Sequence, residues 1–129
     1  DALDRKKMTS RVDLSEWFEP LLTDLTHEEF WVALLDGANK VIETRRLTQG
    51  GQQQTIVDIP ILLRLALEKS ALAVAVAHNH PSGQNKASHE DIKITHRVKQ
   101  GCDAVGIRFL DHIIIAQGRY YSFSDEGKI

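Results

Sequence analysis

Apolar residues recur at helical spacing near the start of the chain, as they do on one face of an α-helix. The pattern consists of Leu14, Trp17, Phe18, Leu21, Leu22 and Leu25. Pro20 falls inside this pattern, and an internal proline removes a backbone hydrogen bond and clashes with the preceding turn. We therefore expect a helix that is kinked or broken at Pro20.

Continuous apolar runs predict buried strands at two places. Residues 30–35 form the first run and residues 72–77 form the second, and short uninterrupted runs are typical of strands that are covered on both faces. After the first run, residues 36–39 read Asp-Gly-Ala-Asn, which indicates a turn. Residues 41–47 then predict the returning strand of a hairpin, followed by a polar loop at residues 50–54.

Two further helices are predicted where a capping residue precedes an apolar face. Asp58 can cap the first of them, which carries Pro60 in its first turn. Ser88 begins the second, and we expect Gly101 to end it. Between the two helices, residues 78–87 read as a loop because they include proline, serine, glycine and asparagine.

The end of the chain predicts a second group of strands. Residues 104–110 and 112–116 read as strands, Gln117-Gly118 turns the chain, and residues 120–123 can pair back. The order of elements is then helix, two strands, helix, strand, helix and two or three strands. A hairpin at each end of this order predicts a mixed β-sheet flanked by helices, an α+β or α/β/α arrangement.

The 129 residues fit a single domain. Residues 1–13 are charged and non-periodic, so we expect a linker or a disordered start there and a domain at residues 14–129. The longest apolar run, residues 72–77, is too short to cross a bilayer, and no membrane association is expected. Cys102 is the only cysteine, which excludes an internal disulfide and favours a cytoplasmic location. We expect it to be a small apolar core residue.

The formal net charge of the chain is −2. Strong nonspecific binding to nucleic acid depends on lysine and arginine side chains that neutralise phosphates. Arg45-Arg46 is the densest positive segment after the start of the chain, and it is small. DNA binding by this domain alone is therefore expected to be weak or absent.

The residues that point to chemistry gather between positions 78 and 91. His78 and His80 are separated by one residue at the end of a predicted strand, so both imidazoles point to one face and can reach one metal ion. Asp91, in the first turn of the next helix, is placed to add a carboxylate ligand. Two histidines and one carboxylate leave a fourth position open, as in catalytic zinc sites.

Each of these residues also has a simpler explanation. Asp91 lies three residues after Ser88, which matches a helix capping box, and random placement of the six histidines would give roughly 0.3 pairs with this spacing. Asp111-His112 either supports the ligands or lies at a strand edge, and we favour the strand edge. Three further histidines are expected to be surface residues: His27, His89 and His96.

The order of the whole stretch resembles the signature of the JAMM (JAB/MPN-type) metallohydrolases: His78-x-His80, seven residues, Ser88, two residues and Asp91. The wider sequence is similar to the RadC-like branch of that superfamily over roughly residues 14–129. The matching segments are 27–36, 77–83, 91–95, 110–115 and 122–127. Two departures are Ala87, where the family usually has proline, and Gly50-Gly51, where it often has a Gly-Thr pair.

The resemblance implies a JAB/MPN-like fold with a cytidine deaminase-like architecture. It implies one zinc ion per chain, held by His78, His80 and Asp91. Ser88 would contact the substrate or the developing oxyanion, and a glutamate would accept a proton from the attacking water. The implied activity is hydrolysis of an amide or isopeptide bond in a protein or peptide.

Three glutamates are candidates for the general base. The family pattern points to Glu28, with Glu43 and Glu29 as the alternatives. If the predicted hairpin turn is right, Val32 lies opposite about Glu43 and Glu28 lies opposite about Leu47, which separates Glu28 from Glu43 by ~14 Å of strand. Glu29 should point to the opposite face from Glu28.

Two other functions stay open at this point. RadC-like proteins are traditionally linked to DNA repair, so one alternative is a module that acts on nucleic acid, although the net charge counts against it. The other alternative is a non-catalytic protein-interaction domain. Members of the superfamily with that role typically lose metal ligands, and this chain keeps all three.

Overall fold

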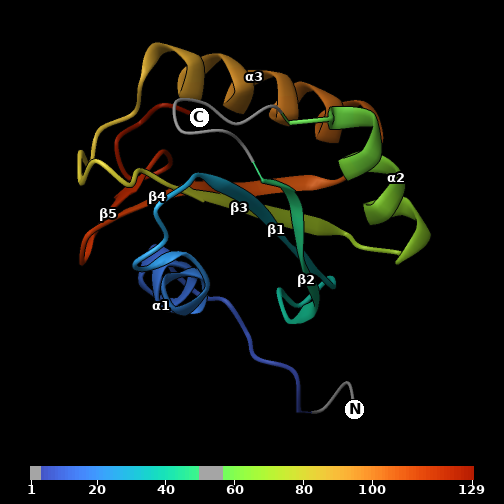
Figure 1. Cartoon of the computed structure of the whole chain (residues 1–129). Coiled ribbons are helices and arrows are strands. Elements are labelled where there is room, and N and C mark those ends of the chain that lie inside the picture. Colours follow the sequence, from blue (N-terminus) through green and yellow to red (C-terminus); the bar gives the residue numbers. More distant parts are fainter. Residues whose placement is uncertain (1–3, 50–56) are drawn as a thin grey trace.

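A central five-stranded sheet with helices on both faces organises the chain (Figure 1). The computed structural model describes residues 4–49 and 57–129, so the polar loop expected at residues 50–54 lies outside the described residues. The helices are α1 (Arg11–Leu22), α2 (Ile59–Glu68) and α3 (His89–Ala104), and the strands are β1 (Glu29–Leu35), β2 (Val41–Gln49), β3 (Ala73–Asn79), β4 (Arg108–Ala116) and β5 (Arg119–Ser122).

The sheet has the strand order β2-β1-β3-β4-β5. Among its described pairs, β3 and β4 run parallel and the other neighbours run antiparallel. Helix α1 covers one face, and α2 and α3 cover the other (Figure 1). The predicted α+β class, a mixed sheet flanked by helices, is therefore confirmed, and the arrangement is consistent with a JAB/MPN-like fold.

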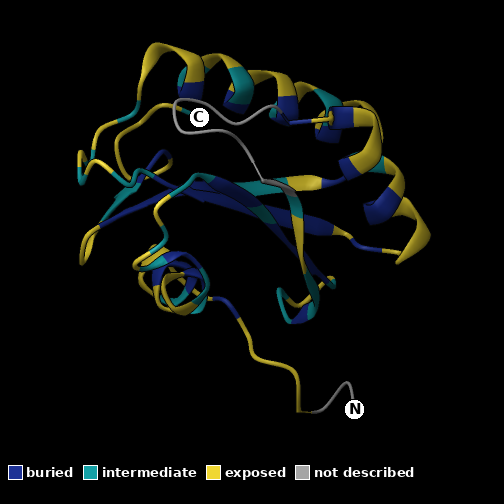
Figure 2. Ribbon diagram, viewed as in Figure 1, coloured by how far each residue is buried: buried dark blue, intermediate teal, exposed yellow. Residues whose placement is uncertain are grey.

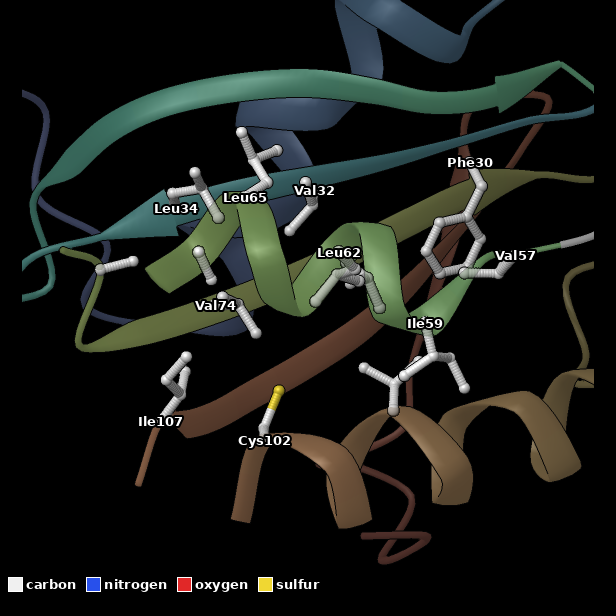
Figure 3. Close-up of a cluster of buried hydrophobic side chains, with 14 residues drawn as sticks. Phe30, Val32, Leu34, Val57, Ile59, Leu62, Leu65, Val74, Cys102 and Ile107 are labelled. Atoms are coloured by element: carbon white, nitrogen blue, oxygen red, sulfur yellow. The ribbon is translucent and has the colours of Figure 1, made fainter. Parts of the chain in front are cut away.

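Side chains alternate between the two faces of the sheet and build an apolar cluster on each. On β1, Phe30, Val32 and Leu34 join the cluster beneath α2 and α3, whereas Ala33 and Leu35 join the cluster on the α1 side. Figure 3 shows the first cluster, and Figure 2 shows the buried strands between the two helical layers. Burial on both faces explains the nearly continuous apolar sequences of β1 and β3.

Cys102 lies on α3 within the cluster shown in Figure 3. Burial raises the pKa of its thiol to about 11, so the prediction of an apolar core residue is confirmed. We expect Ellman's reagent at pH 8 to label Cys102 at least about 100-fold faster in guanidinium chloride than in the native protein, because the native thiol is both shielded and protonated. Cys102 is the only thiol, so rapid labelling of the folded chain would contradict this burial.

Helix α1 begins before the first residue of the predicted apolar pattern, Leu14, and ends before its last residue, Leu25. It begins at Arg11, capped by Ser10, and Met8 is buried. The packed structure therefore begins before residue 14, the domain boundary that the sequence predicts. Pro20 lies inside the helix, which continues for two residues beyond it and ends at Leu22.

Helix α3 continues through Gly101, where we expected it to end. A Cβ at this position would lie 3.0 Å from Leu63 Cδ1, so the glycine allows α2 and α3 to approach closely. The helix ends instead before Gly106, which has a left-handed φ of 76°, and Ile107 N donates to Cys102 O at 2.9 Å. This geometry is typical of a helix C-terminus closed by glycine.

The two strands expected between residues 104 and 116 form one strand, β4. Its pairing with β3 skips Leu110, because Phe109 and Asp111 pair with consecutive residues of β3. This irregularity is a β-bulge. A bulge changes the side-chain alternation without ending the strand, which explains why the sequence pattern suggested a break there.

The register of the β1–β2 hairpin also differs from its prediction. Leu34 pairs with Glu43, and Val32 pairs with Arg45. The connecting loop has five residues, 36–40, and Asp36 Oδ1 accepts hydrogen bonds from the backbone N–H groups of Ala38 and Lys40. The β1–β2 pairing also shifts at two points. Glu43 is therefore even farther from Glu28 than expected.

No helix in residues 4–49 and 57–129 combines the length and the apolar character that a bilayer-crossing segment needs.

Candidate metal centre

Three candidate ligands meet where β3 ends and α3 begins. His78 still belongs to β3, although we expected the loop to start there, and His80 follows the strand directly. Asp91 lies in the first turn of α3. His78 Nε2 lies 3.0 Å from His80 Nε2 and 3.0 Å from Asp91 Oδ1, and His80 Nε2 lies 3.0 Å from Asp91 Oδ2. The structure thus brings the three predicted ligands together as a group that could hold a metal ion.

A capping box fixes the start of α3 beside the histidines. Ser88 Oγ accepts a hydrogen bond from Asp91 N at 3.1 Å, and Ser88 N donates to Asp91 Oδ2 at 2.8 Å. The simpler explanation for Asp91 and the ligand explanation are therefore compatible. One carboxylate both caps the helix and faces the two imidazoles.

The protonation pattern of His80 suits a metal ligand. His80 Nδ1 lies 2.7 Å from the carbonyl oxygen of Gln84, and a carbonyl can only accept, so Nδ1 carries the hydrogen. In the neutral ring the lone pair is then on Nε2, the nitrogen that faces Asp91 and would bind a metal; in the protonated ring Nε2 donates a hydrogen bond to Asp91. Imidazole nitrogen and carboxylate oxygen are the donor set of many zinc and other divalent-metal sites, so these residues fit such an ion.

The charges of the cluster favour a cation. Burial alone would raise the pKa of Asp91, but hydrogen bonds from His78 and His80 hold it well below its usual range. Burial alone would lower the pKa of His80, but its hydrogen bonds to Asp91 and to the Gln84 carbonyl raise it. Asp91 is therefore an ionised carboxylate at neutral pH, buried between two imidazoles.

This cluster lines an open cleft of about 660 Å³. Glu28, immediately before β1, and Ser88 line the same cleft as His78, His80 and Asp91. The negative charge of Glu28 is one of the influences that raise the pKa of His80. Glu28 and Ser88 are therefore placed together with the three candidate ligands.

Asn79 holds the backbone on both sides of Glu28. Its side-chain oxygen accepts a hydrogen bond from Glu29 N at 2.8 Å, and its amide nitrogen donates to His27 O at 2.9 Å. Asn79 is buried and lies between the two candidate histidine ligands in the sequence. No periodic pattern marks Asn79 in the sequence, although its position between two predicted ligands was an available signal.

The two rival glutamates lie elsewhere. Glu29 is buried on the other side of β1, where its carboxylate contacts His27 Nε2 at 2.7 Å and accepts from Trp31 Nε1 at 3.0 Å. Glu43 forms ion pairs with Arg45 and with Lys69, opposite Leu34 and roughly 20 Å along the strand from Glu28. Of the three candidates, Glu28 alone lines the cleft.

Two of the predicted surface histidines, His89 and His96, are exposed. His27 is half-buried against Glu29, so the surface prediction was wrong for it. The strand-edge interpretation of His112 was also wrong, because β4 lies between β3 and β5. His112 is fully buried, and burial together with the neighbouring His78 lowers its pKa well below the usual value.

Comparisons with known proteins agree with the resemblance seen in the sequence. Residues 8–128 match the family described as RadC-like JAB domain. The UPF0758 protein of Flavobacterium johnsoniae is 42% identical over 127 residues, which is 98% of this chain and 56% of the relative. The UPF0758 protein of Porphyromonas gingivalis is 43% identical over 109 residues, which is 84% of this chain and 48% of the relative. The chain thus spans about half the length of the curated relatives it matches.

These matches cover nearly the whole chain, and the candidate metal group lies inside the matched region. The chain therefore belongs to the RadC-like JAB domain family, which is linked to the metallohydrolase superfamily.

Proposed function

We propose that this chain is a zinc-dependent hydrolase that cleaves an amide or isopeptide bond in a protein or peptide. The observation that carries the proposal is the shared cleft. It joins a His-His-Asp group that could hold a metal with a carboxylate, Glu28, and a hydroxyl, Ser88. A cleft lined by candidate metal ligands, a base and a hydrogen-bond donor has the parts that hydrolysis requires.

A zinc ion held by His78, His80 and Asp91 would act as a Lewis acid and lower the pKa of water in the cleft. Glu28 accepts a proton from the water as the water oxygen adds to the carbonyl carbon. Glu28 then returns this proton to the amide nitrogen as the C–N bond breaks, which releases a carboxylic acid and an amine. One carboxylate thus serves first as base and then as acid.

Ser88 is suited to stabilise the charge on the carbonyl oxygen. Its Oγ already accepts a hydrogen bond from Asp91 N, so the hydroxyl hydrogen is directed elsewhere and can be donated to the substrate. Ser88 is exposed to the cleft. A donor placed at the developing oxyanion stabilises the transition state more than the ground state.

The proposal is tested by incubating the zinc-loaded chain with a proteome-derived peptide library and with peptides branched through a lysine side-chain amide. We expect mass spectrometry to detect new amino termini, or released branches, that disappear after chelation of the zinc. The matched control is Glu28→Gln, prepared and loaded with zinc in the same way. Zinc-independent cleavage, or no cleavage of either substrate class by a zinc-loaded chain, would contradict the proposal and favour a non-catalytic interaction domain.

A further inference from the structure

A continuous series of hydrogen bonds links two of the candidate ligands behind the cleft. Thr95 Oγ1 lies 2.6 Å from the backbone oxygen of Asp91 and 2.6 Å from His112 Nδ1. His112 Nε2 lies 2.8 Å from His78 Nδ1. Thr95 and His112 both have 0% exposure, so no water competes for these bonds. We name the pair the Thr95–His112 relay.

The direction of every hydrogen bond in the relay follows from the first one, between Thr95 and the Asp91 backbone oxygen. The Asp91 backbone oxygen can only accept, and two acceptors 2.6 Å apart would repel each other, so the single hydroxyl hydrogen of Thr95 is donated to it. Thr95 Oγ1 must then accept from His112, which places the ring hydrogen of His112 on Nδ1.

The direction of the hydrogen bond between His112 and His78 follows from the position of the hydrogen on His112. A His112 ring that donates from Nδ1, buried and without an anionic partner in the relay, accepts at Nε2. His78 must therefore carry its hydrogen on Nδ1 and donate to His112. In the neutral ring this leaves the lone pair on His78 Nε2, the atom that lies 3.0 Å from Asp91 Oδ1 and from His80 Nε2 and that would bind the metal.

Packing holds the His112 ring in the orientation that the relay needs. The ring stacks on Phe123, with centroids 4.6 Å apart and an interplanar angle of 5°, and makes a T-shaped contact with Phe30, with centroids 5.6 Å apart. Both aromatic side chains are buried. His112 is therefore not free to rotate and exchange its two nitrogens.

We propose that Thr95 and His112 are positioning residues that set the tautomer and ring orientation of His78, and thereby prepare the ligand cluster for a divalent metal. The Asp91 backbone oxygen fixes the direction of the first hydrogen bond. The relay therefore couples α3, which carries Asp91, to β3, which carries His78. The role in metal binding rests on the proposed function. The hydrogen bonds of the relay are those of the chain without any metal. Partners of this kind typically change metal affinity by about 10–100-fold.

The test uses Thr95→Val and Thr95→Ser, with zinc affinity measured by competition against a chromophoric chelator. Thr95→Val keeps the shape and removes the hydroxyl, and we expect it to weaken zinc binding by about 10–100-fold. Thr95→Ser keeps the hydroxyl and should bind zinc close to the native affinity. His112→Phe, which keeps the aromatic packing, should weaken binding as Thr95→Val does.

Thr44→Val is the matched control, because the Thr44 hydroxyl accepts from Trp17 Nε1 in the β2–α1 contact, away from the ligands. The Thr44→Val substitution can lower the midpoint of urea unfolding but should leave the zinc affinity unchanged. A merely structural role for Thr95 would produce this same result. Native zinc affinity in a folded Thr95→Val chain would therefore overturn the proposal.

A second measurement separates failure of the relay from failure of the proposed function. Nitrogen-15 spectra of the histidine rings in the metal-free chain report which ring nitrogen carries the hydrogen. We expect His112 to carry it on Nδ1, and in Thr95→Val to lose this preference. If the native chain binds no zinc but His112 shows the expected tautomer, the zinc proposal fails and the relay stands. If His112 carries its hydrogen on Nε2, the relay is overturned whether or not zinc binds.

Discussion

Replacing Glu28 by glutamine is expected to lower the turnover of amide hydrolysis by about 10²–10⁴ while the chain keeps its zinc, because a general base contributes to rate without holding the metal. The substitution keeps the size of the side chain and removes its ability to accept a proton. Glu28 lines the cleft beside His80 and Asp91 but lies outside the group that could hold the ion. Turnover of a peptide found in the library screen and zinc content by elemental analysis are measured on the same preparation.

The control for this prediction is Glu43→Gln, which makes the same chemical change on the neighbouring strand. Glu43 is engaged by Arg45 and Lys69 and does not line the cleft, so its loss should leave turnover near the native value. Two results would remove Glu28 from the role of base. One is full activity of Glu28→Gln, and the other is an equal loss of activity in both variants.

Replacing Asp91 by asparagine is expected to reduce zinc affinity strongly. The reduction should exceed the change of about 10–100-fold that follows the loss of a residue supporting a ligand. The reason is that the substitution removes the one anionic donor from the ligand group. The pKa of Asp91, which its hydrogen bonds to His78 and His80 lower against the opposing effect of burial, shows that the ionised form is the one stabilised here. The asparagine oxygen can still accept from Ser88 N, as Asp91 Oδ2 does at 2.8 Å. Chelator competition gives the affinity, and circular dichroism checks that α3 remains helical.

Glu90→Gln is the matched control for the charge change. Glu90 lies in the same first turn of α3 and is exposed, with Lys93 as an ion-pair partner at 3.9 Å. The Glu90→Gln substitution therefore removes one negative charge from the same helix end without changing the ligand group. Zinc affinity should change little in Glu90→Gln; equal losses in the two variants would mean that the general field, and not ligation by Asp91, holds the ion.

The elements of the fold were largely predictable because their signals are local. Capping by Asp58 and Ser88 depends on residues three positions away, and both helices begin where their caps predict. The apolar runs that became β1 and β3 reflect burial on both faces. The element order, which follows from these local signals, predicted the mixed sheet.

Sequence features whose role depends on packing against a distant helix or strand led to wrong predictions. Gly101 looked like a helix end, but it serves the close contact with Leu63 of α2, a residue far away in the chain. Leu110 looked like part of a strand boundary, but it is the extra residue of a bulge against β3. In both cases the composition of the segment is ambiguous, and packing against a distant element decides between the alternatives.

The spacing of His78, His80 and Asp91 pointed to the candidate ligand group, because a strand end followed by a capped helix brings residues that are close in the chain to one point. The resemblance to the JAMM signature then favoured the ligand explanation over the simpler ones. The sequence left Glu28, Glu29 and Glu43 open, since the choice depends on hairpin register and on the face that β1 turns toward α3. The relay through Thr95 and His112 joins β4 to α3 and β3, and hydrogen bonds between such elements leave no periodic trace in the sequence. Local spacing therefore determined which residues could bind a metal, whereas strand pairing and helix packing decided which side chains surround and orient them.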